Sequence, residues 1–254
     1  MVATGLAMDH YFRGEHAVVN GWIRRAHRML EGIGPCPELG WLCIVEAHMA
    51  LRVDHDPATA QELSARAVAL GRSLGNIDLE MLALAYEGCA LGDQGKIAEG
   101  MHRLDEAAAA ALAGEMSHLY AIAMTYCCVI YTCERVRDFH RVAQWCATLK
   151  ELCERWSYWM KLSICRTYYA STFIWRGVWA EAEIEEAIRA LERTRPAQAA
   201  DGLVRLAELR RRQGRFDEMA LLLEKADTHP FRMLAGHLAI PSGTPQWRWI
   251  GATP

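Results

Sequence analysis

The 254-residue sequence lacks the marks of a disulfide-stabilised, secreted or membrane-spanning protein. Its nine cysteines include no Cys-x-x-Cys pair, and most lie in apolar stretches where cysteine acts as a small hydrophobic residue. Residues 1–14 contain no long apolar core of a secretory signal, and no uncharged stretch reaches the roughly 18 residues that cross a bilayer. We expect reduced thiols, a cytoplasmic location and no membrane partner.

An excess of positive charge is also missing. The formal net charge is −3, whereas a nucleic-acid-binding domain usually carries a basic surplus. The basic run 210–212 is balanced by nearby carboxylates, and the acidic run 181–186 alternates around its predicted helix. We therefore expect structural roles for the basic run, a solvated face for the acidic run, and no direct binding of nucleic acid.

The usual catalytic and metal-binding motifs are absent. The stretch 92–97 resembles a phosphate loop only in its Gly-Lys pair, because it lacks the first glycine and the hydroxyl residue that contacts magnesium. There is no His-Glu-x-x-His or Gly-x-Ser-x-Gly motif. His48 and His55 are seven residues apart without a nearby carboxylate, which favours surface or partly packed side chains. The sequence predicts no enzyme, no catalytic residues, no metal site and no cofactor.

What the sequence does contain is a recurring break between amphipathic helical stretches. The six breaks fall at Gly14, His55, Gly95, Arg137, Gly177 and Gly214, with spacings of 41, 40, 42, 40 and 37 residues. Alternating strand patterns are nearly absent, so we predict an all-α protein. A fixed period of this length predicts a solenoid of about six helix-turn-helix repeats over residues 1–227. Several prolines and glycines beyond residue 227 predict an irregular tail, 228–254.

The helices should be capped and packed in specific ways. Asp56 before Pro57, and Asp138, are suitable N-caps. The small residues Gly88 and Gly100 should let two helix backbones approach closely. Apolar residues at helical spacing predict the buried faces, among them Val19, Trp22, Ile23, Ala26 and Leu30 in the first repeat and Leu203, Leu206, Ala207, Phe216, Leu223 and Ala226 in the last.

Small residues recur at fixed positions in the second helix of several predicted repeats. Ala60, Gly100 and Ala182 lie early in these helices, and Ala67 and Ala107 follow seven positions after the first two. With glycine at the turns, the repeats resemble tetratricopeptide units. The resemblance implies a right-handed superhelical solenoid, although the period near 40 exceeds the standard 34.

Longer repeats of this kind resemble the repeat arm of large LuxR/MalT-type bacterial transcription regulators. The similar segments are 78–85, 95–107 and 133–139. This resemblance implies a non-catalytic scaffold or sensor arm in transcriptional regulation, whose partner is a protein, a peptide or a small apolar effector. No helix-turn-helix DNA reader follows the repeats.

In a tetratricopeptide solenoid the first helix of each repeat lines the concave groove. Counting positions from the turn in each repeat predicts that charged and aromatic side chains lie on that face. Peptide-binding surfaces use this mixture of side chains. The candidate binding residues are Met49, Arg52, Tyr131, Glu134, Arg135, Trp175, Glu208, Arg211 and Arg212.

Two other interpretations remain open. Thirteen of the 22 aromatic residues lie within residues 119–179, which is explained either by thicker core packing or by an aromatic-lined pocket. Such a pocket would suit an all-α small-molecule-binding protein or enzyme. A homodimer is the third interpretation, because a solenoid that lacks a polar capping helix exposes apolar surface.

Overall fold

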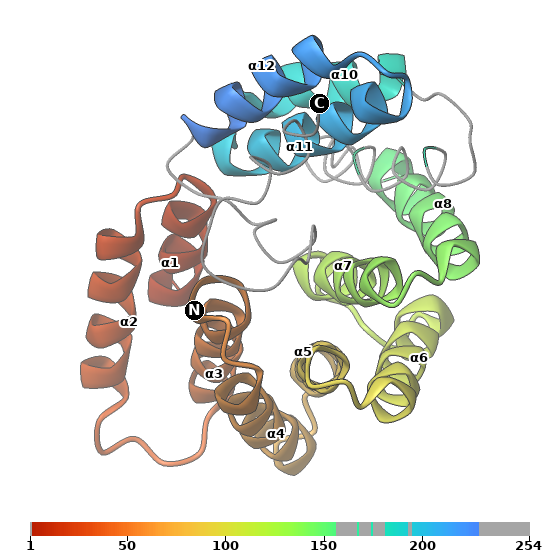
Figure 1. The fold of residues 1–254 in the computed structure, drawn as a ribbon. Helices are drawn as coiled ribbons and strands as arrows, with labels where there is room; N and C mark the ends of the chain where they lie inside the picture. Colours follow the sequence, from red (N-terminus) through yellow and green to blue (C-terminus); the bar gives the residue numbers. More distant parts are fainter. Residues whose placement is uncertain (1, 156–166, 168–173, 175–180, 193–194, 229–254) are drawn as a thin grey trace. The chain divides into compact units, whose positions relative to one another are not determined.

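The protein is all-helical in the part that the computed structural model describes, as the sequence predicts (Figure 1). The described residues are 2–155, 167, 174, 181–192 and 195–228. They form two compact units, residues 1–11 with 15–152 and residues 12–14 with 153–254. Among these described helices, none is both long enough and apolar enough to cross a bilayer.

The first unit holds a series of helices that pack against their neighbours. Its elements are α1 (Val2–Phe12), α2 (His16–Leu30), α3 (Pro37–Met49), the π-helix η1 (Ala50–Asp54), α4 (Pro57–Ser73), α5 (Ile77–Asp93), α6 (Ile97–Ala113), α7 (Leu119–Arg135) and α8 (Phe139–Arg155). Helix α5 packs against α4 and α6, and also against α3 and α7. The first helices of three successive predicted pairs, α3, α5 and α7, therefore contact one another in order.

The second unit contains α10 (Glu181–Glu192), α11 (Pro196–Arg212) and α12 (Phe216–Asp227). Helix α11 packs against both α10 and α12. Its core joins Ile184 and Ile188 of α10 to Leu203, Leu206 and Leu209 of α11, with Ala226 of α12. At the α10–α11 crossing, a β-carbon on Gly202 would lie 2.6 Å from Ile188 Cγ1, so glycine permits close packing there.

The predicted turns share one backbone geometry. Gly14, His55, Gly95, Arg137 and Gly214 all have positive φ, between 54° and 82°. At Gly95, Arg137 and Gly214 the next residue donates its N–H to the carbonyl five positions earlier, which is the Schellman closure of a helix end. Gly177, the remaining predicted turn, lies outside the described residues. The breaks inferred from sequence are thus real helix ends where the structure describes them.

The turn at His55 departs from this geometry because η1 precedes it. Asp56 donates its N–H to the Ala50 carbonyl, six positions back, at 2.9 Å. One extra residue is therefore accommodated in the last turn of the helix, as in a π-bulge. Such bulges are frequent at functional sites, and this one contains Arg52.

Two predicted N-caps are confirmed. The Asp56 carboxylate accepts the N–H groups of Ala58 and Thr59, and the Asp138 carboxylate accepts that of Arg141. Each aspartate satisfies donors that the first helical turn leaves without partners.

The close approach of α5 and α6 is confirmed as well. A β-carbon on Gly100 would lie 2.6 Å from the Gly88 carbonyl oxygen, and one on Gly88 would lie 2.8 Å from the Gly100 oxygen. Both neighbours are backbone atoms and cannot rotate away. Only glycine fits at this crossing.

Some predicted core positions are wrong. Phe216 at the start of α12 is 54% exposed, although Leu223 and Ala226 of the same helix are buried. In α2 only Val19 and Ala26 are buried, and Trp22, Ile23 and Leu30 are half-buried. Helix periodicity predicts a whole apolar face, but the described residues cover only part of that face in α2 and α12.

Asp78 links two consecutive predicted repeats. It lies in the first turn of α5, and its Oδ1 accepts the N–H groups of Ser117 and His118 at 2.8 and 2.9 Å. Its Oδ2 accepts the Ser117 hydroxyl at 2.8 Å. The carboxylate therefore caps the start of α7 from a residue about 40 positions earlier in the chain.

We expect Asp78→Ala to lower the free energy of unfolding by about 1–2 kcal/mol, because two backbone donors at the start of α7 lose their acceptor. Ser117→Ala removes only the hydroxyl bond and should cost less than half as much. Urea unfolding of both variants measures the difference. Equal losses would show that the backbone bonds to Asp78 contribute nothing.

Candidate binding face on α3–η1, α5 and α7

The C-terminal ends of α3–η1, α5 and α7 bring charged and aromatic side chains together. Arg52 lies in the middle of η1, and its guanidinium carbon is 3.3 Å from the centre of the Tyr131 ring on α7. Both residues are buried. A guanidinium that stacks on an aromatic ring in a buried setting forms a cation–π contact stronger than an exposed one.

A second guanidinium and a carboxylate complete this cluster. Arg135, one turn after Tyr131, has its guanidinium carbon 5.5 Å from the same ring centre. Its Nε is 2.7 Å from Asp93 Oδ1 on α5, and the Tyr131 hydroxyl donates to Asp93 Oδ2 at 3.3 Å. Asp93 therefore joins α5 to two residues of α7. We call Arg52, Asp93, Tyr131 and Arg135 the Arg–Tyr cluster.

Burial determines the protonation state of Tyr131. Removal from water raises the pKa of its hydroxyl, and the nearby Arg52 charge only partly opposes this effect. The phenol is therefore neutral at physiological pH and remains a donor to Asp93.

A second buried polar group lies on α3 and α5. His48 Nδ1 and the Tyr86 hydroxyl share a hydrogen bond of 2.8 Å, and the His48 ring meets the edge or face of the Tyr11 ring at a centroid distance of 4.4 Å. All three side chains are buried, and burial raises the pKa of Tyr86 well above its ordinary value. The expected surface or partly packed position of His48 is wrong, because Tyr11 and Tyr86 enclose it.

Cys89 lies between these groups on α5. The Thr132 hydroxyl donates to its sulfur at 3.4 Å, and the Cys89 thiol donates to the Cys128 carbonyl at 3.5 Å. Burial opposes ionisation of Cys89, but the contact with Cys128, the Arg52 charge and the Thr132 hydrogen bond together lower its pKa. The thiol is fully buried, so it serves packing and polarity here and has no access to a substrate.

The structure joins three of the sequence-predicted binding residues, Arg52, Tyr131 and Arg135. Met49 and Glu134 lie on the same helices, Met49 buried and Glu134 half-buried. Arg135 is the most open member of the Arg–Tyr cluster, with 30% of its side chain exposed. The face is thus less open than the turn register alone indicates, because the wide turn of η1 carries Arg52 onto the Tyr131 ring.

The other predicted binding residues belong to the later part of the chain. Trp175 lies outside the described residues. Glu208, Arg211 and Arg212 are on α11 in the second unit, where Glu208 accepts hydrogen bonds from Arg211 at 2.7 Å and from Arg212 at 2.8 Å. Burial raises the pKa of Glu208, but these bonds outweigh it and the net shift is downward. These three residues form an ion-pair triad within one helix.

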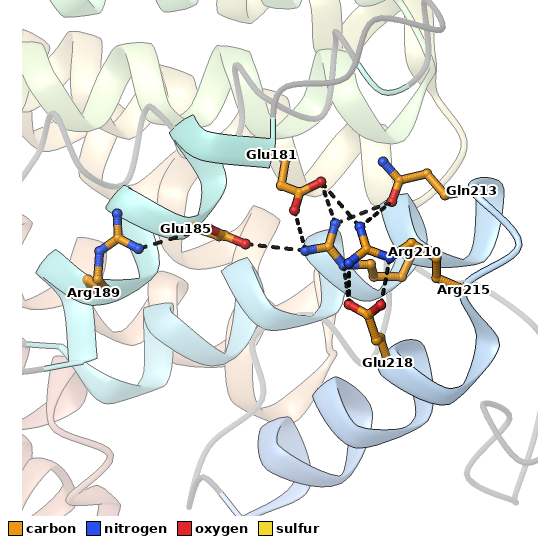
Figure 2. A network of polar contacts seen from close by, with 7 residues as sticks. All are labelled: Glu181, Glu185, Arg189, Arg210, Gln213, Arg215 and Glu218. Carbon is orange, nitrogen blue, oxygen red and sulfur yellow. Dashed lines mark hydrogen bonds and ion pairs between the residues drawn. The ribbon is translucent and has the colours of Figure 1, made fainter.

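Arg210 makes the densest set of ion pairs in the described second unit (Figure 2). Its guanidinium lies 2.6 Å from Glu181 and 3.2 Å from Glu185, both on α10, and 3.1 Å from Glu218 on α12. The basic run 210–212 is therefore bound to carboxylates, as the structural interpretation predicts. The acidic run is only partly a solvated face, because Glu181 and Glu185 hold Arg210.

Sequence reasoning missed Asp93, Tyr86 and Tyr11. A signal for Asp93 exists in the turn register. Arg135 lies two residues before the turn at Arg137, Asp93 two residues before Gly95, and Arg52 three residues before His55.

Eight of the thirteen aromatic residues of the segment 119–179 lie outside the described residues. In its described part, the rings of Tyr126 and Trp145 stack with centroids 5.5 Å apart, which is packing between α7 and α8. The aromatic-lined pocket stays a prediction. Within the described residues, no three histidine, cysteine, aspartate or glutamate side chains are grouped so as to hold a metal ion.

No known family model matches this chain, and no curated protein is significantly similar to it in sequence.

Proposed function

We propose that this chain is a non-catalytic binding arm, a right-handed superhelical solenoid of tetratricopeptide-like repeats with a period near 40 residues. The left-handed turns at the predicted positions and the packing of α3, α5 and α7 in sequence support this proposal. In such an arm each repeat adds one helix to a continuous binding face.

The Arg–Tyr cluster is the observation on which the proposed role depends most. Arg52, Asp93 and Arg135 lie at nearly equivalent positions before three successive turns, and all three side chains contact Tyr131 or one another. A repeat protein that places charged and aromatic side chains at equivalent positions offers a row of anchors to an extended partner.

The exposed edge of the cluster is where a partner makes contact in this proposal. A carboxylate of the partner competes with Asp93 for Arg135, which is the most accessible guanidinium. Arg52 and Tyr131 form a rigid base beneath it, so little side-chain entropy is lost on binding. The partner is a protein or peptide segment, or a small effector that carries an acidic group beside its apolar part.

The resemblance to LuxR/MalT-type repeat arms supports a regulatory context. We propose that the chain acts in the cytoplasm and in transcriptional control, without direct contact to DNA. Homodimerisation is compatible with this role and is a separate property to measure.

The test begins with affinity capture from the source cells and a thermal-shift screen of small carboxylic acids. The binder is then titrated against the wild-type chain, Arg135→Ala and Lys150→Ala, the last a change at an exposed position on α8. We expect Arg135→Ala to raise Kd at least about tenfold, which is the size of a binding hot spot, and Lys150→Ala to leave it unchanged. A binder whose affinity is the same for all three chains would overturn the proposal.

A further inference from the structure

Helix α2 carries an unusual distribution of charge. Its fifteen residues contain Arg24, Arg25 and Arg28 and no aspartate or glutamate. All three arginines are exposed, and none forms an ion pair within the described residues. By contrast, Arg141 is paired with Asp105 and Arg210 with Glu181, each on another helix.

Apolar residues form a narrow seam beside these cations. Val18, Trp22, Arg25 and Met29 are separated by four, three and four residues, which is the spacing of a heptad seam. Val18 is 41% exposed and Met29 62% exposed, while Trp22 is half-buried under the Arg25 guanidinium at 5.3 Å. Large apolar side chains exposed in a row are costly unless another surface covers them.

The rest of α2 is already engaged. Val19 and Ala26 are buried, α2 packs against α3, and His27 bonds to Glu46 of α3 at 2.7 Å. In Figure 1, α2 lies at the margin of the first unit, next to α1 and α3. The exposed seam residues Val18 and Met29 and the three arginines are separate from the buried positions Val19 and Ala26, and they remain exposed in the described part of the chain.

We infer that α2 is a docking surface for an acidic amphipathic helix of a partner protein. The partner's apolar residues pack between Val18, Trp22 and Met29, and its carboxylates flank them opposite Arg24 and Arg28. This pairing follows the rule of helical seams, in which apolar positions supply the packing and flanking charges select the partner. Arg25 within the seam requires one acidic residue in the partner's own apolar stripe. This surface is independent of the Arg–Tyr cluster and does not rest on its proposed function.

The width of the seam disfavours a membrane as the occupant. A helix that lies in the membrane interface inserts a broad continuous apolar face, whereas the exposed seam of α2 is narrow and is interrupted by Arg25. The seam also disfavours a nucleic acid, because apolar side chains between the arginines gain nothing from a phosphate backbone and the chain is acidic as a whole.

The test uses a synthetic helical peptide of about three heptads, with leucine in the seam except for one glutamate opposite Arg25, and with glutamate beside the seam. Its binding to the full chain is measured by fluorescence anisotropy at low and high salt. A peptide with glutamine in place of glutamate reports the contribution of charge. Vesicles of phosphatidylserine and phosphatidylcholine and a DNA duplex are titrated in the same way.

The variants are the triple substitution Arg24→Gln, Arg25→Gln and Arg28→Gln, and a matched control with the same loss of charge at exposed positions, Arg66→Gln, Lys96→Gln and Lys150→Gln. We expect the α2 variant to bind the acidic peptide at least about tenfold more weakly and the control to bind it as the wild type does. The double substitution Val18→Ser and Met29→Ser should also weaken binding of the peptide, and the size of this weakening should be the same at low and high salt. The inference is overturned if the control loses as much affinity as the α2 variant, if the glutamine peptide binds equally well, or if vesicles or DNA bind α2 more tightly than the peptide.

Discussion

Gly100→Ala lowers the free energy of unfolding by about 2–3 kcal/mol in our account, the largest loss that we expect from a single added methyl group. The new β-carbon would lie 2.6 Å from the Gly88 carbonyl oxygen and 3.0 Å from the Gly92 nitrogen, so α5 and α6 must move apart. Alanine favours the helix over glycine by about 1 kcal/mol, but the lost packing exceeds this gain. The shift of the urea unfolding midpoint measures the effect.

The control for this prediction is Gly21→Ala in α2. Nothing lies within 4 Å of a β-carbon at Gly21, so only the helix preference changes and the variant should be slightly more stable than the wild type. The two glycine-to-alanine substitutions are thus expected to change the free energy of unfolding in opposite directions. Stabilisation by Gly100→Ala would show that the α5–α6 crossing is looser than described.

Arg210→Met has the second largest expected effect. The Arg210 side chain is only 5% exposed, and its guanidinium joins α10, α11 and α12, whereas methionine fills similar volume without charge. Removing the guanidinium leaves three carboxylates close together, but they are 35–47% exposed and can regain water. We therefore expect the free energy of unfolding to fall by about 1–3 kcal/mol. This is less than the roughly 3–5 kcal/mol lost when one partner of a fully buried ion pair is removed. Arg189→Met, which removes an exposed pair of 3.9 Å, should change stability by less than about 0.5 kcal/mol.

The same variant has a defined pH dependence. The hydrogen bond from Arg210 lowers the pKa of Glu181 in the folded chain, whereas the unfolded chain has an ordinary glutamate pKa near 4.3. A lowered carboxyl pKa stabilises the fold above the unfolded pKa, and this contribution is lost as the pH falls through the folded pKa. The difference in unfolding free energy between wild type and Arg210→Met should therefore shrink as the pH falls below about 4.3. A difference that grows on acidification would contradict the assignment.

Local signals were sufficient to predict much of the fold. Glycine, proline and capping aspartates determine where helices begin and end, and for this reason the breaks at His55, Gly95, Arg137 and Gly214 could be read directly. The contact between Gly88 and Gly100 could also be predicted, because small residues on facing helices allow the two backbones to approach closely. Phe216 was misassigned because periodicity does not say whether a neighbour exists on the face it marks.

The binding face could be predicted only in part. The positions of Arg52, Tyr131 and Arg135 relative to the turns predict that they share one face. That prediction assumes a regular α-helix where the structure has the π-helix η1. No residue type in the sequence predicts the π-helix η1, so the burial of Arg52 against Tyr131 could not be predicted. His48 likewise has a surface-compatible sequence context, and its enclosure depends on Tyr11 and Tyr86, which are distant in the chain.

Hydrogen–deuterium exchange with and without the captured binder tests the central claim most directly. The proposed role predicts slower exchange in η1 and in the C-terminal turns of α5 and α7, where Arg52, Asp93 and Arg135 lie, with little change in the second helices α4, α6 and α8. Protection confined to α4, α6 and α8, with none in the segments that carry the Arg–Tyr cluster, would contradict it.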